Sequence, residues 1–167
     1  VILETDIPAV TDIPFETMLN IKKLLGAIGS SVPYTPNLSD IRSRLYISDQ
    51  RTLLKYLNYL EKAEIIKTLS KNVSGKNILK KPDKIYLNNT NLLKALNFEK
   101  HDNGTIREIF FYNQLSNNHR VTYPSTGDFK VNDYVFEVGG KNKKQKQIEN
   151  IDNAFLVLDN IEIGFAK

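Results

Sequence analysis

Apolar residues in the first part of the chain recur three or four positions apart, as they do along one face of an α-helix. This spacing covers residues 15–28 and follows Pro14, which is suited to the first turn of a helix. The stripe consists of Met18, Ile21, Leu24, Leu25 and Ile28. Pro33 and Pro36 then keep the backbone out of a helix. The pattern therefore predicts one amphipathic helix followed by a loop.

Two more helices are expected next, each marked by a capping residue. Ser39-Asp40 can cap a short helix that runs through Leu45. Ser48 or Asp49 can cap the third helix, whose buried stripe is Leu53, Leu54, Leu57 and Leu60. The outer face of this third helix carries polar and charged residues: Gln50, Arg51, Lys55, Asn58 and Tyr59.

Two short apolar stretches after the third helix have the character of strands. They cover residues 65–69 and 84–87 and are separated by a polar, turn-rich stretch through Gly75. The order of helix, short helix, helix and β-hairpin resembles the winged-helix variant of the helix-turn-helix proteins, over about residues 13–90. In that family the third helix can enter the major groove of DNA. A winged-helix domain is therefore expected here.

Positive charge is concentrated in this region. The chain has a net charge of +4, but residues 51–100 hold eleven Lys and Arg against four Asp and Glu, a net of +7. Clustered cations favour an anionic partner, because they release counterions when they neutralise phosphates. A DNA-binding interpretation uses Arg51, Lys55 and Asn58 on the third helix, with backbone contacts from Lys67, Lys71, Lys76, Lys80 and Lys81. The alternative is a protein-binding domain whose lysines only solvate an exposed β-ribbon.

The second half of the chain alternates between one helix and several strands. A helix is expected from Thr105 to Asn117-Asn118, with a broad buried face of Ile106, Ile109, Phe110, Phe111 and Leu115. Strands are expected over residues 120–123, 128–131, 134–138 and 154–158, the last of them wholly buried. This order predicts an α/β layer.

Two carboxylates meet in the expected hairpin of this layer. Only Asn132-Asp133 separates Val131 from Tyr134, which suits a two-residue turn. Pairing Val131 with Tyr134 places Asp128 opposite Glu137, with their Cβ atoms about 5 Å apart. The other face is apolar, which favours this register: Phe129, Val131, Tyr134, Phe136 and Val138. The hairpin therefore brings two acids together.

Like charges across a strand pair require a compensating cation. Lys130 lies on the same face, two residues from Asp128, and would give an ordinary ion-pair network. The other candidate is Mg²⁺, which one or two carboxylates with waters and phosphates can hold. Asp128 and Glu137 are thus either an ion-pair cluster or candidate metal ligands.

The stretch from Asp128 to Lys141 resembles the PD-(D/E)XK nuclease superfamily, and the resemblance covers residues 104–158. It implies Asp128 as the metal-binding acid, Glu137 as the second acid and Lys141 as the catalytic lysine. In that family the second acid and the lysine are two residues apart on one strand. Here Gly139-Gly140 lengthens the separation from about 6.6 Å to about 13 Å, unless a bulge shortens it.

Glu108 has two interpretations. It matches a further glutamate that many such nucleases carry on the helix before the sheet, and it also completes a Thr-x-x-Glu capping box with Thr105. The lysines after the hairpin could likewise grip phosphates or simply solvate a helix start: Lys141, Lys143, Lys144 and Lys146.

Together, the winged-helix pattern and the Asp…Glu-Val-Gly-Gly-Lys stretch resemble the C-terminal half of a prokaryotic AAA+-type ATPase family with a frequently degenerate nuclease-like domain. The resemblance implies a linker over residues 1–12, a winged-helix domain over 13–90, and a restriction-endonuclease-like mixed sheet flanked by helices over 91–167, incomplete at its C-terminal end. ATP would be bound only by a preceding module, since the chain opens without methionine and Gly140-Lys141 lacks the rest of a phosphate loop.

Composition excludes several other classes. Cysteine is absent, so disulfides and Cys-based zinc sites are ruled out, and the cytoplasm is the expected location. No apolar run approaches the roughly 20 residues that span a bilayer, so no membrane contact is expected. His101 and His119 lie in no metal-ligand or triad spacing.

The sequence therefore favours an α+β or α/β chain that acts as a non-catalytic interaction module of an ATPase and contacts DNA or a partner protein. The alternative is a DNA nuclease that depends on Mg²⁺ or Mn²⁺. Lys130 or Lys141 decides between them, according to whether either can reach a water between the two acids.

Overall fold

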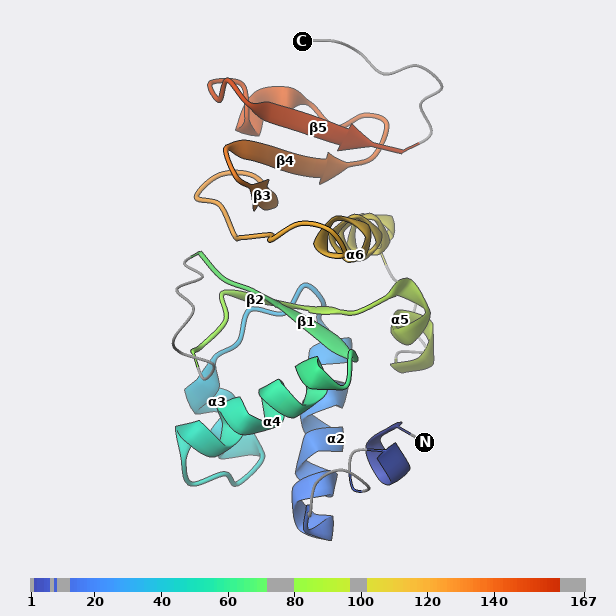
Figure 1. The fold of residues 1–167 in the computed structure, drawn as a ribbon, viewed down its shortest axis with the longest axis vertical. Coiled ribbons are helices and arrows are strands. Elements are labelled where there is room, and N and C mark those ends of the chain that lie inside the picture. Colours follow the sequence, from blue (N-terminus) through green and yellow to red (C-terminus); the bar gives the residue numbers. More distant parts are fainter. Residues whose placement is uncertain (1, 7, 9–12, 72–79, 97–101, 160–167) are drawn as a thin grey trace. The chain divides into compact units, whose positions relative to one another are not determined.

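The structure is a computed structural model that describes residues 2–6, 8, 13–71, 80–96 and 102–159. Its fold is mixed α+β, with helices and two small sheets (Figure 1). The chain forms two compact units, one of Val1–Leu69 with Ser74–Phe98 and the other of Ser70–Val73 with Glu99–Lys167. This division differs from the expected boundary after residue 90.

Three helices precede the hairpin in the first unit. They are α2 (Phe15–Gly29), α3 (Leu38–Arg44) and α4 (Gln50–Lys62). The expected stripes of α2 and α4 are buried, together with Tyr56, which the sequence pattern did not assign to the core. Helix α4 packs on both α2 and α3.

The helix caps match expectation at one helix and differ at another. Asp49 caps α4, because its carboxylate accepts a hydrogen bond from the Thr52 N–H at 3.1 Å. Helix α3 begins earlier than expected, since its cap is Asn37, whose side chain accepts from the Asp40 N–H at 3.3 Å. Ser39-Asp40 therefore lies inside α3.

The hairpin of the first unit consists of β1 (Ile66–Leu69) and β2 (Lys84–Leu87), which are antiparallel with Ile66 opposite Leu87. Tyr34 extends this sheet, because its backbone exchanges hydrogen bonds of 2.9 and 2.8 Å with Ile85. The loop between α2 and α3 thus supplies a third, single-residue strand. Of the residues between β1 and β2, 72–79 lie outside those described.

Two further elements complete the first unit, and neither was expected. Helix α5 (Thr90–Leu96) packs on α2 and β2, which places it in this unit. Asn89 caps it by accepting from the N–H groups of Asn91 and Leu92. Within the expected linker, a single π-helical turn, η1 (Ile2–Asp6), packs on α2.

The second unit places α6 (Asn103–Ser116) against a three-stranded sheet of β3 (Phe129–Val131), β4 (Tyr134–Gly139) and β5 (Ala154–Leu158). Strand β4 is central, antiparallel to β3 and parallel to β5 (Figure 1). The expected hairpin register is confirmed, since Val131 pairs with Tyr134 and Phe129 with Phe136. Asn132 in the turn has φ 52°, a left-handed conformation that Asn tolerates.

Both faces of this sheet are covered. On one face the Phe111 ring of α6 lies 5.8 Å from the Phe129 ring and 5.4 Å from the Phe136 ring, measured between centroids. On the other face Val135 packs with Ile148 and Ala154. The alternation along β4 therefore separates two small cores, and Glu137 shares the face of Val135.

Three expectations for the second unit are wrong. Residues 120–123 form no strand, because only Thr122 pairs, as a single bridge to Lys130. Strand β5 is not wholly buried, since Phe155 is 49% exposed. Phe110 is 60% exposed, because the buried side of α6 is made by Ile109 and Tyr112.

Candidate functional site

Asp128 is positioned by a glycine and by the backbone of β4. Gly127 has φ +88°, and a Cβ there would lie 2.7 Å from Cγ1 of Val135, so the position requires glycine. The Asp128 N–H donates to the Phe136 carbonyl at 2.9 Å, and its carboxylate accepts from the Val138 N–H at 2.9 Å. Asp128 therefore lies just before β3 and outside the strand pairing, with one oxygen committed to β4.

Glu137 is buried and paired with Lys143, which the sequence pattern suggested only as a phosphate contact or a solvated residue. Its side chain is 2% exposed, and Oε1 lies 2.5 Å from Nζ of Lys143. The expectation that Lys130 neutralises the acids is wrong, because Lys143 holds this position. Lys141, the lysine expected from the resemblance, is exposed.

Several acids act on the same ammonium group. The hydrogen bond to Glu137 raises the pKa of Lys143, partial burial opposes the shift, and the charges of Glu137, Asp128 and Glu108 raise it further. Opposite charges nearby favour the protonated form of a lysine. The acids that sequence analysis selected therefore do share one electrostatic environment, with Lys143 as its cation.

The capping-box interpretation of Glu108 is wrong. Helix α6 starts at Asn103 with Asp102 as its N-cap, so Thr105 lies within the first turn and not at the cap. Glu108 is half-buried on α6, and its charge reaches Lys143. The structure therefore supports an electrostatic contribution of Glu108 to the cluster.

Gly139 and Gly140, which follow Glu137 in the chain, leave space for the side chains of two basic residues. A Cβ at Gly139 would lie 2.4 Å from Cγ and 2.5 Å from Cβ of Lys143. A Cβ at Gly140 would lie 3.2 Å from Nη1 of Arg107, which forms an ion pair with Asp159. Gly139 and Gly140 therefore do not form a bulge that brings Lys141 close to Glu137. Instead, their lack of a side chain lets Lys143 and Arg107 approach the backbone.

This arrangement fits a metal poorly. One oxygen of Asp128 binds a backbone N–H, and the buried oxygen of Glu137 binds an ammonium group. In the part of the chain that the structure describes, no three His, Cys, Asp or Glu side chains are grouped so as to hold a metal ion. The side chains of Asp128, Glu137 and Lys143 can hold β3, β4 and the connection after β4 together, but they offer no pair of free carboxylates.

The expected DNA-binding residues come from several elements and from both units. Arg51 and Lys55 are exposed on α4, with Asn58 half-buried beside them, and the Lys55 ammonium lies 5.6 Å from the Tyr59 ring centroid. Lys67 is half-buried in β1. Lys71 belongs to the second unit, where its ammonium lies 5.8 Å from the Tyr123 ring centroid. The other expected backbone contacts are Lys80 and Lys81, both exposed, and Lys76, which lies outside the described residues together with His101.

The part of that prediction that lies on a single element is the outer face of α4. Lys62 extends it by one further exposed cation, which sequence analysis missed although its spacing of seven from Lys55 was visible. Glu61, the acid next to it, accepts from the N–H and hydroxyl of Thr68 in β1.

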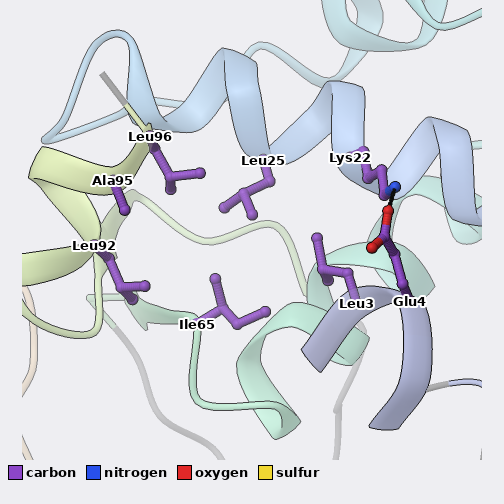
Figure 2. A pocket seen from close by; sticks show the side chains of 8 residues that line it. All are labelled: Leu3, Glu4, Lys22, Leu25, Ile65, Leu92, Ala95 and Leu96. Atoms are coloured by element: carbon purple, nitrogen blue, oxygen red, sulfur yellow. Dashed lines mark hydrogen bonds and ion pairs between the residues drawn. The ribbon is translucent and has the colours of Figure 1, made fainter. Parts of the chain in front are cut away.

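The first unit also contains an open apolar pocket of about 390 Å³ between η1, α2, α5 and Ile65 (Figure 2). Figure 2 shows its leucines from three separate elements around one space, with the Glu4–Lys22 ion pair at one end. The full lining is Leu3, Glu4, Lys22, Leu25, Ile65, Leu92, Ala95 and Leu96. It contains none of the candidate site residues.

Comparison with known families gives one match. The family described as "Domain of unknown function (DUF8612)" matches residues 1–102, more than half of the chain. The chain belongs to DUF8612. The DUF8612 match covers the described helices and hairpin of the first unit and ends just before α6, which starts at Asn103.

No curated protein and no solved structure matches the chain. Within the described ranges, none of the helices has the length and apolar character needed to cross a membrane.

Proposed function

We propose that this DUF8612 protein is a non-catalytic interaction module that contacts duplex DNA through the outer face of α4, within a winged-helix domain. The exposed cations along one side of α4, Arg51, Lys55 and Lys62, are the observation that carries the proposal. The resemblance to an AAA+-type ATPase family supports a role as the DNA-contacting end of such an enzyme, with ATP bound outside this chain.

The architecture of the first unit supports a winged helix. The order α2, α3, α4, β1, β2 resembles that of winged-helix proteins. Tyr34, between the first and second of these helices, pairs with Ile85 and so adds to the hairpin. Helix α4 buries one side on α2 and α3, which leaves its other side for a groove.

The charges of α4 support an anionic partner. Arg51 and Lys55 are one helical turn apart, and Lys62 lies two turns beyond Lys55, so all three project from a similar side. None of them forms an ion pair with another residue that the structure describes. Phosphates would supply counter-charges, and Asn58 could accept and donate at a base edge.

The second unit supports the non-catalytic part of the proposal. Lys143 neutralises Glu137 where a nuclease would hold a metal, and Asp128 is bonded to β4. A nuclease of this kind needs a water molecule bound to a metal ion, and a lysine that is free to act beside that water. Here the lysine itself is the cation.

A fluorescence titration of the chain with duplex DNA at two ionic strengths tests the proposal. We expect affinity to fall steeply with salt, Arg51→Ala and Lys55→Ala each to weaken binding, and Lys55→Ala to reduce the salt slope by about one. Lys23→Ala, on the exposed side of α2, is the matched control and should bind as the wild type does. Affinity that does not depend on salt would contradict the proposal.

A metal-dependent nuclease is the second candidate. It is favoured because the charges of Glu108, Asp128 and Glu137 all raise the pKa of one group, the ammonium of Lys143. We expect no Mn²⁺-dependent plasmid nicking, weak Mn²⁺ binding by calorimetry, and tighter binding in Lys143→Met, where the two acids lose their internal cation. Nicking that is lost in both Asp128→Ala and Glu137→Ala would establish the nuclease instead.

A further inference from the structure

We propose that Tyr46 and the hollow beside it, formed by α3 and the turn that follows it, bind the sugar-phosphate backbone of the duplex whose groove receives α4. The Tyr46 hydroxyl donates a hydrogen bond to a phosphate oxygen there. This inference rests on the proposed DNA contact and adds a binding residue of a different chemical kind from the cations on α4.

Tyr46 is exposed in a left-handed conformation just after the end of α3. Its side chain is 93% exposed, and its φ of 53° is in the left-handed region that bulky residues seldom adopt. The neighbours on both sides, Leu45 and Ile47, are buried in the core of the first unit. The chain is therefore anchored before and after Tyr46, and the turn between them directs this one ring into solvent. A non-glycine residue in this region is strained and persists only where the surrounding structure holds it.

The turn that carries Tyr46 is held by several hydrogen bonds. The Tyr46 N–H donates to the Ser43 carbonyl at 3.3 Å, and the Ile47 N–H donates to the Arg42 carbonyl at 2.9 Å. The Arg42 guanidinium donates to the carbonyls of Ile47 and Ser48. Because these hydrogen bonds fix the backbone, little conformational entropy is lost in ordering it when a ligand binds.

The hollow beside Tyr46 has the chemistry of a phosphate site. Its volume is about 500 Å³, and five of its six lining residues carry a hydroxyl or guanidinium group: Ser39, Arg42, Ser43, Tyr46, Ile47 and Ser48. Hydroxyl and guanidinium groups donate to DNA phosphates in most complexes. No carboxylate is among these lining residues, and the nearby Asp40 is paired with Arg44.

The short distance along the chain between Tyr46 and α4 also favours contact of both with the same duplex. Tyr46 precedes Arg51 by five residues, a chain distance of at most about 18 Å. One strand of duplex carries a phosphate about every 3.4 Å along the axis, so a helix in the groove and this turn can reach one strand together. A protein partner is less well matched, because a single ring among hydroxyl groups lacks the apolar centre of a protein interface.

Binding by Tyr46→Ala and Tyr46→Phe, measured at two ionic strengths, tests the inference. We expect both variants to bind about tenfold more weakly, as for one lost hydrogen bond to a charged group, with an unchanged salt slope because no cation is removed. Phe15→Ala removes another exposed ring, 85% exposed at the start of α2, and should bind normally. Circular dichroism would verify that each variant is folded.

The outcomes separate this inference from the proposed function. If the wild type binds DNA with the expected salt dependence and both Tyr46 variants bind equally well, the inference is wrong while the contact by α4 stands. Normal binding by Tyr46→Phe alone would also overturn it, since the hydroxyl would then contribute nothing. If the wild type does not bind DNA, the proposed function fails, and this inference fails with it.

Discussion

At the scale of single residues, two glycines decide which lysine meets Glu137. The spacing of Glu137 and Lys141 suggested that the glycines pull the lysine back along the strand. Instead, Gly139 has no side chain where the Lys143 stem crosses β4, so the chain can turn and bring a later lysine onto the acid. The motif is therefore explained by close approach and not by strand geometry.

Gly139→Ala should break this ion pair. The added Cβ would lie within 2.4 to 2.9 Å of three carbons of Lys143, so the lysine must move and leave Glu137 buried without its partner. We expect a loss of roughly 1–3 kcal/mol in the unfolding free energy of the second unit, measured by denaturant titration. Gly26→Ala on α2, where nothing lies within 4 Å, is the control and should not destabilise the chain.

The same pair should make stability depend on alkaline pH. Because Glu137 raises the pKa of Lys143 above its ordinary value of 10.5, the stabilisation is complete below about 10.5 and is lost as pH rises through the higher folded value. The difference in unfolding free energy between the wild type and Lys143→Met should therefore shrink above about pH 10.5. A difference that stays constant across this range would show that the pair does not titrate with folding.

At the scale of secondary structure, long periodic patterns predicted the elements well. The stripes of α2 and α4 and the register of β3 with β4 follow from apolar periodicity and a two-residue turn, and the structure confirms them. Helix α5 was missed because, unlike the equally short α3, it was given no expected capping residue, although Asn89 caps it. The expected strand over residues 120–123 depends on a partner edge, which local sequence does not reveal.

The candidate cluster was predictable only in part. Asp128 and Glu137 could be selected because the hairpin register is local, but the pairing of Lys143 depends on a turn after β4 that sequence spacing does not encode. Tyr46 was missed for a similar reason. Its exposure follows from the burial of Leu45 and Ile47 against other elements, and no pattern along the chain indicates it.

The start of α4 offers a test of one element. Asp49 caps this helix, and the N–H groups of Arg51 and Thr52 lower its pKa below the usual 3.8. Its stabilising effect is therefore present above pH 3.8 and is lost as pH falls through the lower value. We expect Asp49→Ala to lower the melting temperature at neutral pH and Asp49→Asn to retain most of it, because Asn also caps well. Equal melting temperatures for Asp49→Ala and the wild type would show that the cap contributes nothing.

At the scale of the whole molecule, each of the two units has buried core residues of its own. The first unit contains α2, α4 and the hairpin, and nearly all of it falls within the DUF8612 match at residues 1–102. The second unit has its own pair of cores on the two faces of β4. The stability of each unit therefore depends on core residues within that unit.

Two thermal transitions are the consequence. Leu53 on α4 and Phe129 on β3 are fully buried in different units, so Leu53→Ala should lower one transition and Phe129→Ala the other. Each substitution should cost about 2–5 kcal/mol in its own unit, and a unit of under 100 residues shifts by about 4–8 °C per kcal/mol. Scanning calorimetry would resolve the transitions, and hydrogen exchange by mass spectrometry would assign them. A single transition that both substitutions displace equally would contradict independent units, because it would require the two cores to unfold as one.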